Sequence, residues 1–313
     1  MKGIDISRAY WETCGRPAIE AQLPALLPKL AAGLCGSGSE CFGFDDEISR
    51  DHDFGPGFML FLPGEDIVDR RAEFQLERLY AKLPREFMGL RRGLVNPVGG
   101  ARRGVIRAAD FFRDRTGAAD GILTVGQWLD APETALAEAV NGAIFYDGSG
   151  EVTTLRARLE RYPQDIRLKK LAGHLLLAGQ AGQYNYLRCV RHGERGAAQL
   201  AVGEFVDHAM AAAFLLNDVY RPFYKWQFRA LRGLPALSGI ANGLEFLLTT
   251  GNGGGLPDEK QAVMERVAGG IIDELRAQEL TRAACGDLEK HAYAVNDLIA
   301  DADLRNAHVL TAV

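Results

Sequence analysis

Apolar residues along the chain follow two different spacings, and the change falls near residue 150. Before that point, helical spacing over residues 66–83 predicts a helix, and short apolar runs predict β-strands at residues 30–35, 58–62, 105–107 and 143–146. After it, apolar residues recur at helical spacing and no further strands are expected. The expected helices cover residues 165–191, 194–219, 222–232, 234–247, 258–279 and 288–300.

These patterns predict an α+β protein with two domains. Residues 1–150 are expected to form a mixed sheet with helices, and residues 151–313 an all-α helical bundle. A length of 313 residues also exceeds the usual size of one compact core. The glycine-rich run TTGNGGGLPDE at residues 249–259 is interpreted as a connection between helices rather than a phosphate loop, because no strand precedes it.

Composition excludes several classes of function. The chain has 36 Lys and Arg against 41 Asp and Glu, a net charge of −5, which argues against sequence-independent binding to nucleic acid. No stretch approaches about 18 uninterrupted apolar residues and the first residues do not resemble a signal peptide, so we expect a cytoplasmic protein without membrane association. Five scattered cysteines without a C-x-x-C pair favour neither disulfides nor a structural zinc site. The oligomeric state stays open.

Residues 36–55, GSGSECFGFDDEISRDHDFG, carry the candidate chemistry. In a strand, the alternation of side chains would send Asp51 and Asp53 to the same face. Two carboxylates about 4 Å apart repel by roughly 4 kcal/mol at an effective dielectric near 20, so a dry site needs a counter-charge. Mg²⁺ prefers one or two carboxylates together with waters and phosphates. Asp51 and Asp53 are therefore the predicted metal ligands and catalytic residues.

The glycine-rich loop before these aspartates is predicted to bind phosphates. Glycines let backbone N–H groups approach phosphate oxygens, and serine hydroxyls can donate hydrogen bonds. The predicted nucleotide-binding residues here are Gly36, Ser37, Gly38, Ser39 and Arg50. A lone GSGS run is commonly an ordinary turn, and an isolated D-x-D is commonly surface charge. Their combination in this order is more specific than either one.

The arrangement Gly-Ser, thirteen residues, Asp-x-Asp resembles the signature of the DNA polymerase β-like nucleotidyltransferase superfamily, although His52 replaces the usual apolar residue between the aspartates. Longer strings resemble the bacterial proteins grouped as DUF4037 within that superfamily. These strings are GSGSECFGFDDEISRDHD, NGAIFYDGSG, YPQDIRLKK, AGQAGQYNYLRC and LLNDVYRPFYKW. The resemblance implies an N-terminal nucleotidyltransferase-like domain followed by helices, and it implies no particular substrate.

The resemblance also implies a reaction. A nucleoside monophosphate would pass from a nucleoside triphosphate, with ATP expected, to a hydroxyl of a small polar acceptor, with Mg²⁺ as the cofactor. Such transfers depend on positioning and charge neutralisation. Lys225, three residues after Pro222 in the first turn of an expected helix, is the candidate cation for the leaving group, on a face shared with Arg221. The alternative is a solvated surface lysine.

A polar segment near the end of the first long helix is the candidate acceptor site. Residues 178–194 crowd more hydrogen-bonding groups together than an apolar core can satisfy, so some are expected to face a cleft. The predicted acceptor-binding residues are Gln183, Tyr184, Asn185 and Arg188. Helix packing across the domain boundary is the alternative. The histidines are expected to be structural or exposed, because their spacing fits no metal site.

A third carboxylate, which the superfamily commonly places on a later strand, is missing from residues 103–107. Asp110, which follows that strand, is one candidate substitute, although capping of a helix that begins at Phe111 is its favoured role. A base from the helical domain is the alternative, with Glu194, Glu204 and Asp207 as candidates.

The missing acid leaves a second hypothesis, a catalytically inactive nucleotide-binding regulator. In that protein, Arg50 and Arg107 would neutralise the two aspartates without a metal. A third hypothesis is a helical interaction protein for which the α/β domain is a scaffold.

Overall fold

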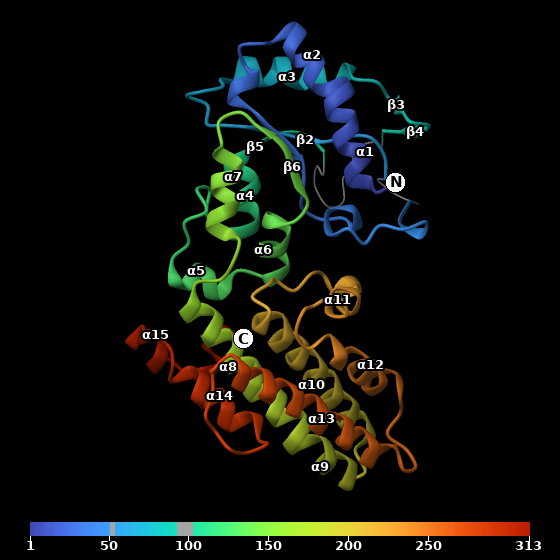
Figure 1. Cartoon of the computed structure of the whole chain (residues 1–313), viewed down its shortest axis with the longest axis vertical. Helices are drawn as coiled ribbons and strands as arrows, with labels where there is room; N and C mark the ends of the chain where they lie inside the picture. The colour runs from blue at the N-terminus through green and yellow to red at the C-terminus, as the bar shows by residue number, and fades with distance from the viewer. Residues whose placement is uncertain (51–53, 93–102) are drawn as a thin grey trace. The chain divides into compact units, whose positions relative to one another are not determined.

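The computed structural model of the chain describes residues 1–50, 54–92 and 103–313 (Figure 1). Contacts divide these residues into two compact units. The N-terminal unit contains Met1–Gln127 and Ala131–Glu160, and the helical unit contains Trp128–Asp130 and Arg161–Val313. The sequence analysis placed the change of domain at residue 150, and the helix that follows that residue groups with the N-terminal unit.

Four strands of the N-terminal unit form one mixed sheet in the order β5-β2-β1-β6. Strand β1 runs antiparallel to both β2 and β6, whereas β2 and β5 are parallel. Each strand coincides with one of the predicted apolar runs, so the mixed sheet is confirmed. The strands are β1 (Ala31–Leu34), β2 (Met59–Leu62), β5 (Gly104–Arg107) and β6 (Ala143–Asp147).

Helices surround this sheet. The α-helices are α1 (Gly3–Tyr10), α2 (Arg16–Gln22), α3 (Arg70–Lys82), α4 (Ala108–Thr116), α5 (Val125–Asp130), α6 (Glu133–Val140) and α7 (Glu151–Leu159). A π-helix, η1 (Trp11–Gly15), joins α1 to α2, and short 3-10 helices are η2 (Leu27–Lys29), η3 (Ser39–Phe42) and η4 (Ile48–Arg50). Helix α3 falls within the predicted residues 66–83 and begins at Arg70, because the Asp69 side chain accepts the Ala72 N–H at 2.8 Å.

The strand alternation gives each face of the sheet its own core. Ala32, Leu60 and Leu62 belong to a buried cluster that also contains residues of α1, α2 and α3. Phe61, between two of them, packs on the other face edge-on against Phe111 of α4, with ring centroids 5.3 Å apart. Figure 1 shows α1, α2 and α3 on one side of the strands and α4, α6 and α7 on the other. The sheet is therefore covered by helices on both faces, with β1 and β2 buried and β5 and β6 half-buried.

The helical unit contains the long helices that the sequence predicts and, beyond residue 300, a short helix that it does not predict. They are α8 (Gln164–Ala178), α9 (Tyr186–Arg191), α10 (Arg195–Leu216), α11 (Tyr224–Leu231), α12 (Ala241–Thr249), α13 (Leu256–Ala277), α14 (Leu288–Asn296) and α15 (Ala302–Asn306). A π-helix, η5 (Gly179–Asn185), makes α8 and α9 continuous, and 3-10 helices are η6 (Ser238–Ile240) and η7 (Val309–Ala312). A mixed sheet followed by an all-α part is the predicted fold class, which is confirmed.

Two differences from the expected elements have local causes. The helix expected from residue 234 begins only at Ala241, because Leu237 has a left-handed backbone with φ of 65°. A small hairpin of β3 (Glu86–Phe87) and β4 (Leu90–Arg91) was not predicted, because its two-residue strands are too short to show a hydrophobic period.

The core of the helical unit buries charged side chains. Helix α10 contacts α8, α12 and α13, and α8 also packs against α14. The buried Lys169 ammonium donates to Asn296 Oδ1 at 2.9 Å and to the Ala307 carbonyl at 2.7 Å. Burial lowers the pKa of this lysine. Such contacts connect the C-terminal helices to α8.

Helix α10 is the one helix among the described residues that is long and apolar enough to cross a membrane, with a mean hydropathy of 1.2. Because 61% of that window is buried within the structure, α10 also fits the description of a core helix.

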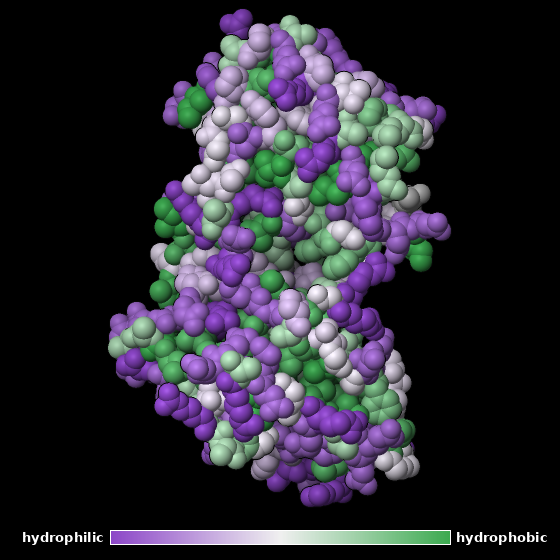
Figure 2. All heavy atoms as spheres, in the orientation of Figure 1, coloured by the Kyte–Doolittle hydropathy of each residue, from purple (hydrophilic) through white to green (hydrophobic). Residues whose placement is uncertain are grey.

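On the face drawn in Figure 2, hydrophilic and hydrophobic residues are intermixed. The five cysteines all lie in described segments and are free, as expected from their spacing.

Candidate functional site

The segment predicted to bind phosphates follows β1 directly and begins with two glycines in unusual conformations. Gly36 has φ of 96° and Gly38 has φ of 136°, which residues with a Cβ rarely adopt. The chain then enters η3 at Ser39, whose side chain is buried together with that of Glu40. The glycines therefore permit a tight bend between a buried strand and a short helix.

Strand register brings four chain segments to the end of the sheet where this bend lies. Gly33 of β1 pairs with Met59, the first residue of β2, and Leu34 pairs with Ala143, the first residue of β6. Met59 in turn pairs with Gly104, the first residue of β5. The loop after β1 and the segments that enter β2, β5 and β6 thus lie at one sheet end.

Asn141 fixes the position of Gly36. The Gly36 N–H donates to Asn141 Oδ1, and Asn141 Nδ2 donates to the Gly36 carbonyl, both at 2.8 Å. The next residue, Gly142, donates its N–H to the Cys41 carbonyl of η3 at 2.8 Å. Asn141 lies in the quoted string NGAIFYDGSG, but sequence reasoning gave it no role, because its partner is 105 positions away.

Arg115 of α4 places a cation beside Gly36. Its guanidinium lies 3.8 Å from the centroid of the Phe111 ring, Nη1 donates to the Phe111 carbonyl at 3.1 Å, and Nε is 3.8 Å from Glu138 Oε2. A Cβ built on Gly36 would lie 3.0 Å from Arg115 Nη2. Within the described part of the chain, Nη2 has no hydrogen-bond partner. This arginine was also missed by the sequence analysis.

Two further ionisable groups at the bend are withdrawn from solvent. Burial raises the pKa of the Cys35 thiol to about 11, although Arg156 and Arg115 act in the opposite direction. Glu40 pairs with Arg103 at 3.4 Å. The thiol is thus held protonated at neutral pH and the carboxylate is compensated by a cation. The neutral Cys35 thiol and the Glu40–Arg103 pair therefore add no net charge to the bend.

Asp51 and Asp53, the predicted catalytic and metal-binding residues, lie outside the described residues. Arg50 is the last residue of η4. The described segment that follows the aspartates, residues 54–58, leads into β2 at the same sheet end as the bend. Among the described residues, no group of three or more His, Cys, Asp or Glu side chains is placed to hold a metal ion. The metal assignment therefore depends on the two aspartates.

Three of the four candidates for a third acid make other contacts, whereas Glu194 directly precedes α10 and makes no side-chain capping bond. Asp110 lies inside the first turn of α4, whose N-cap is Arg107, and pairs with Arg113 at 2.5 Å; its expected capping role is wrong. Helix α4 begins at Ala108, directly after β5, and not at Phe111 as expected. In the helical unit, Glu204 is 3.3 Å from His208, and Asp207 pairs with Arg221 at 2.6 Å.

Arg107, expected to neutralise the aspartates in an inactive protein, is engaged elsewhere. Its guanidinium pairs with Glu73 at 2.6 Å and donates to the Pro63 and Val68 carbonyls. Arg107 ends β5, opposite Leu62, so it lies at the far end of the sheet from the bend. These contacts give the Arg107 guanidinium three hydrogen-bond acceptors, none of which is an aspartate.

In the helical unit, Lys225 is exposed in the first turn of α11, with Nζ 4.9 Å from the centroid of the Trp226 ring. Arg221 lies before the helix, so the expected shared face is wrong. The reason is that residues 219–223 lie outside any helix and α11 starts only at Tyr224.

The predicted acceptor-binding segment coincides with η5 and the start of α9. Gln183 Nε2 donates to Glu265 Oε2 and to the Gly286 carbonyl, both at 2.8 Å, and Gln183 Oε1 accepts the Leu288 N–H at 2.9 Å. Tyr184 is exposed, with the Arg188 guanidinium 4.8 Å from its ring centroid. Asn185 ends η5 and is half-buried. The Gln183 amide therefore supports the wall of a pocket.

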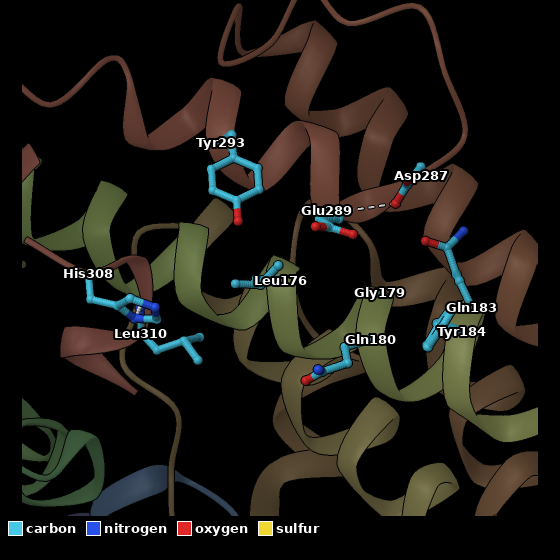
Figure 3. Close-up of a pocket in the computed structure, with 10 residues that line it drawn as sticks. All are labelled: Leu176, Gly179, Gln180, Gln183, Tyr184, Asp287, Glu289, Tyr293, His308 and Leu310. Carbon is cyan, nitrogen blue, oxygen red and sulfur yellow. Dashed lines mark hydrogen bonds between the residues drawn. The ribbon is translucent and has the colours of Figure 1, made fainter. Parts of the chain in front are cut away.

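That pocket has a volume of about 510 Å³ and is formed entirely within the helical unit. From α8 and η5 it is lined by Leu176, Gly179, Gln180, Gln183 and Tyr184 (Figure 3). The C-terminal segments add Asp287, Glu289, Tyr293, His308 and Leu310. The expected cleft is thus present beside Gln183 and Tyr184, and their role in binding an acceptor stays a prediction. The five lining residues from the C-terminal segments were not predicted, because they lie over 100 positions later in the chain than Gln183 and Tyr184.

A half-buried pair of histidines was also missed. His174 of α8 and His208 of α10 approach with their Nδ1 atoms 2.9 Å apart. Desolvation lowers the pKa of His174 well below its usual value and lowers that of His208 as well. The pair is therefore neutral at physiological pH, with one ring donating to the other.

Comparison with known proteins supports the resemblance found in the sequence. Residues 128–227 match the family model of DUF4037, a domain of unknown function. Four of the five quoted strings lie in this segment, whereas the string with the Gly-Ser and Asp-x-Asp residues lies before it. The match to this family model covers 100 of the 313 residues.

One solved structure matches the chain, a nucleotidyltransferase-like protein from Exiguobacterium sibiricum. It is 13% identical, and the match covers 90% of this chain and 80% of that chain with a TM-score of 0.38. No curated protein matches the chain.

Proposed function

We propose that this DUF4037-containing protein is a metal-dependent nucleotidyltransferase that moves a nucleoside monophosphate from a triphosphate to a hydroxyl of a small polar acceptor. The observation that carries the proposal is the clamped Gly36. Asn141 holds both backbone polar groups of this residue at 2.8 Å, at the sheet end where the chain also enters β2. A bend held in this way presents its remaining N–H groups and hydroxyls in a fixed direction, as a phosphate site requires.

In this proposal the bend and its neighbouring arginine bind the triphosphate. Gly36, Ser37, Gly38 and Ser39 would contact phosphate oxygens, and Arg115 Nη2, 3.0 Å from the position of a Gly36 Cβ, would pair with one of them. Arg50 and Lys225 are further candidates for neutralising phosphate charge. Asp51 and Asp53 would hold Mg²⁺, which when bound would neutralise the triphosphate.

The acceptor is proposed to be a small molecule, with Gln183, Tyr184, Asn185 and Arg188 near its binding site. ATP is the proposed nucleotide and the cytoplasm the proposed location. Attack by an acceptor hydroxyl on the α-phosphate would form a new phosphoester bond and release pyrophosphate. The hydroxyl proton would leave to solvent or to a side chain not yet assigned.

A transfer assay tests the proposal. ATP labelled at the α-phosphate is incubated with the protein, Mg²⁺ and a mixture of small hydroxyl-bearing metabolites, and both labelled products and pyrophosphate are measured. We expect labelled products with the native protein and a loss of at least 100-fold in Asp51→Asn and Asp53→Asn, on the order of the effect of removing a catalytic electrostatic group. Asp114→Asn, which removes an exposed carboxylate of α4, is the matched control and should retain activity.

One observation favours a second candidate, a nucleotide-binding regulator without catalysis. Strand β5 carries no acid, and Asp110 beyond it is paired with Arg113. The same assay separates the candidates. Magnesium-dependent ATP binding without pyrophosphate release across a broad acceptor mixture would identify the regulator, and pyrophosphate release would exclude it.

A further inference from the structure

The pocket of the helical unit has the dimensions of a small-molecule site. Its volume of about 510 Å³ falls within the range of roughly 300–1,000 Å³ that is typical for ligand pockets. Every lining residue belongs to the helical unit. A ligand bound here would therefore be recognised by this unit alone, whether or not the N-terminal unit transfers nucleotides.

The wall of the pocket is built on a rare backbone conformation. Residues Gly179–Asn185 form a π-helix, η5, and π-helical segments occur frequently at functional sites. Gly179 allows this wall to approach α14 closely, because a Cβ at that position would lie 3.2 Å from the Glu289 backbone nitrogen. The Gln183 amide bonds both to Gly286 and to Leu288, which fixes the start of α14 against η5. The pocket is thus held open by specific contacts between distant segments.

The charges of the lining determine the class of ligand. Asp287 and Glu289 are acidic, and no Lys or Arg is among the described lining residues. Asp287 Oδ1 accepts the Glu289 N–H at 3.0 Å and caps α14, whereas the Glu289 side chain has no hydrogen-bond partner within the described segments. Glu289 is therefore the carboxylate available to a ligand. A phosphate or carboxylate group would be repelled from this lining.

The remaining lining suits the body of an organic cation. Figure 3 shows the Tyr293 hydroxyl and the His308 ring pointing toward the space bordered by Leu176 and Glu289. His308 Nδ1 accepts the Leu310 N–H at 3.2 Å, and its Nε2 has no hydrogen-bond partner among the described residues. Leu176 and Leu310 add apolar surface for an alkyl chain, and the aromatic ring of Tyr293 can contact a cation.

We propose that this pocket binds a small alkylamine, with the protonated amine at Glu289 and the alkyl chain over Leu176. This inference concerns the pocket that the proposed acceptor residues Gln183 and Tyr184 also line, and it assigns a cation-binding carboxylate there that does not depend on nucleotidyl transfer. Since Glu289 is exposed, its ion pair with the amine should be weak, and the affinity should fall as salt increases.

Three ligands with one five-carbon body test the proposal. Cadaverine carries an amine at each end, 1,5-pentanediol a hydroxyl and glutarate a carboxylate. Each is titrated into the full-length protein by calorimetry, and the His308 ring signals are followed by NMR. We expect saturable binding of cadaverine with a change in the His308 signals, and no saturable binding of the other two.

A matched pair of variants locates the site. Glu289→Gln and Glu259→Gln each remove a carboxylate from the first turn of a helix, but only Glu289 lines the pocket. Glu289→Gln should weaken cadaverine binding about threefold, and Glu259→Gln should leave it unchanged. The proposal is overturned if cadaverine does not saturate, if the diol binds equally well, or if the two variants bind cadaverine alike.

Discussion

Asn141 and Gly36 are joined by two hydrogen bonds of 2.8 Å that run in opposite directions between one side-chain amide and one residue's backbone. This arrangement satisfies the backbone groups of Gly36 as a neighbouring strand would, although β1 ends at Leu34. The bend after β1 is therefore anchored to the segment that enters β6. Because the same bend is the proposed phosphate site, its rigidity and its function are linked.

Replacing Asn141 by leucine should destabilise the N-terminal unit. Leucine has a similar size but leaves the Gly36 N–H and carbonyl without their partner, which costs about 1–3 kcal/mol for a buried polar group. The measurement is urea unfolding, with a transition resolved for each unit. Asn306→Leu, at the exposed end of α15, is the control and should change neither transition by more than about 0.5 kcal/mol. Equal transitions for native protein and Asn141→Leu would show that the clamp is not a stabilising contact.

Arg115→Gln should lower affinity for ATP about tenfold while leaving affinity for AMP nearly unchanged. The proposed contact of Arg115 Nη2 is to a phosphate that AMP lacks, and hydrogen bonds to charged groups contribute about 1.5–3 kcal/mol. Calorimetry at two salt concentrations measures the effect. Arg113→Gln, on the exposed face of the same helix, is the matched control. Parallel losses for ATP and AMP would instead indicate that Arg115 has a structural role.

Cys35 should make the N-terminal unit sensitive to alkaline pH. Its folded pKa is raised to about 11 from a usual value of 9.0, so the unfolded chain loses the proton first as pH rises. The contribution of the Cys35 thiol to the free energy of unfolding is therefore fully present below about pH 9. It falls by about 2–3 kcal/mol as pH rises through 11. Urea unfolding at about pH 8 and pH 10.5 measures the loss, and Cys35→Ala should remove this part of it. An identical pH dependence in the variant would contradict the assignment.

His174 should make the helical unit sensitive to acid. Its folded pKa is lowered from the usual 6.5, chiefly by desolvation and also by His208, so the unfolded chain takes up a proton first as pH falls. The contribution of neutral His174 to the free energy of unfolding is fully present above about pH 6.5. Below that pH it decreases by at most about 1.4 kcal/mol per pH unit. Unfolding by urea at successive pH values checks this slope, which should be shallower in His174→Gln. A slope equal to that of the native protein would count against a buried neutral histidine.

Much of the fold could be predicted because local patterns determine it. The four strands of the sheet coincide with apolar runs, and α8, α10 and α13 coincide with residues at helical spacing. The late start of α12 could not be predicted, because the left-handed conformation of Leu237 interrupts an apolar pattern that continues unchanged. Hydrophobic periodicity reports burial and does not report backbone strain.

The candidate sites were predicted only where their residues are close in sequence. The Gly-Ser bend and the cleft beside Gln183 and Tyr184 came from short local strings. Asn141 reaches Gly36 only through the pairing of β6 with β1, and Glu289 reaches η5 only through the packing of α14 on α8. Such partners depend on tertiary contacts that no local spacing encodes.

Calorimetric titration of the full-length protein with a non-hydrolysable ATP analogue, with and without Mg²⁺, tests the central claim most directly. The account predicts saturable binding that requires Mg²⁺, is lost in Asp51→Asn and in Asp53→Asn, and is retained in Asp114→Asn. Binding that is equal in the presence and absence of Mg²⁺, or that survives in both aspartate variants, would contradict it.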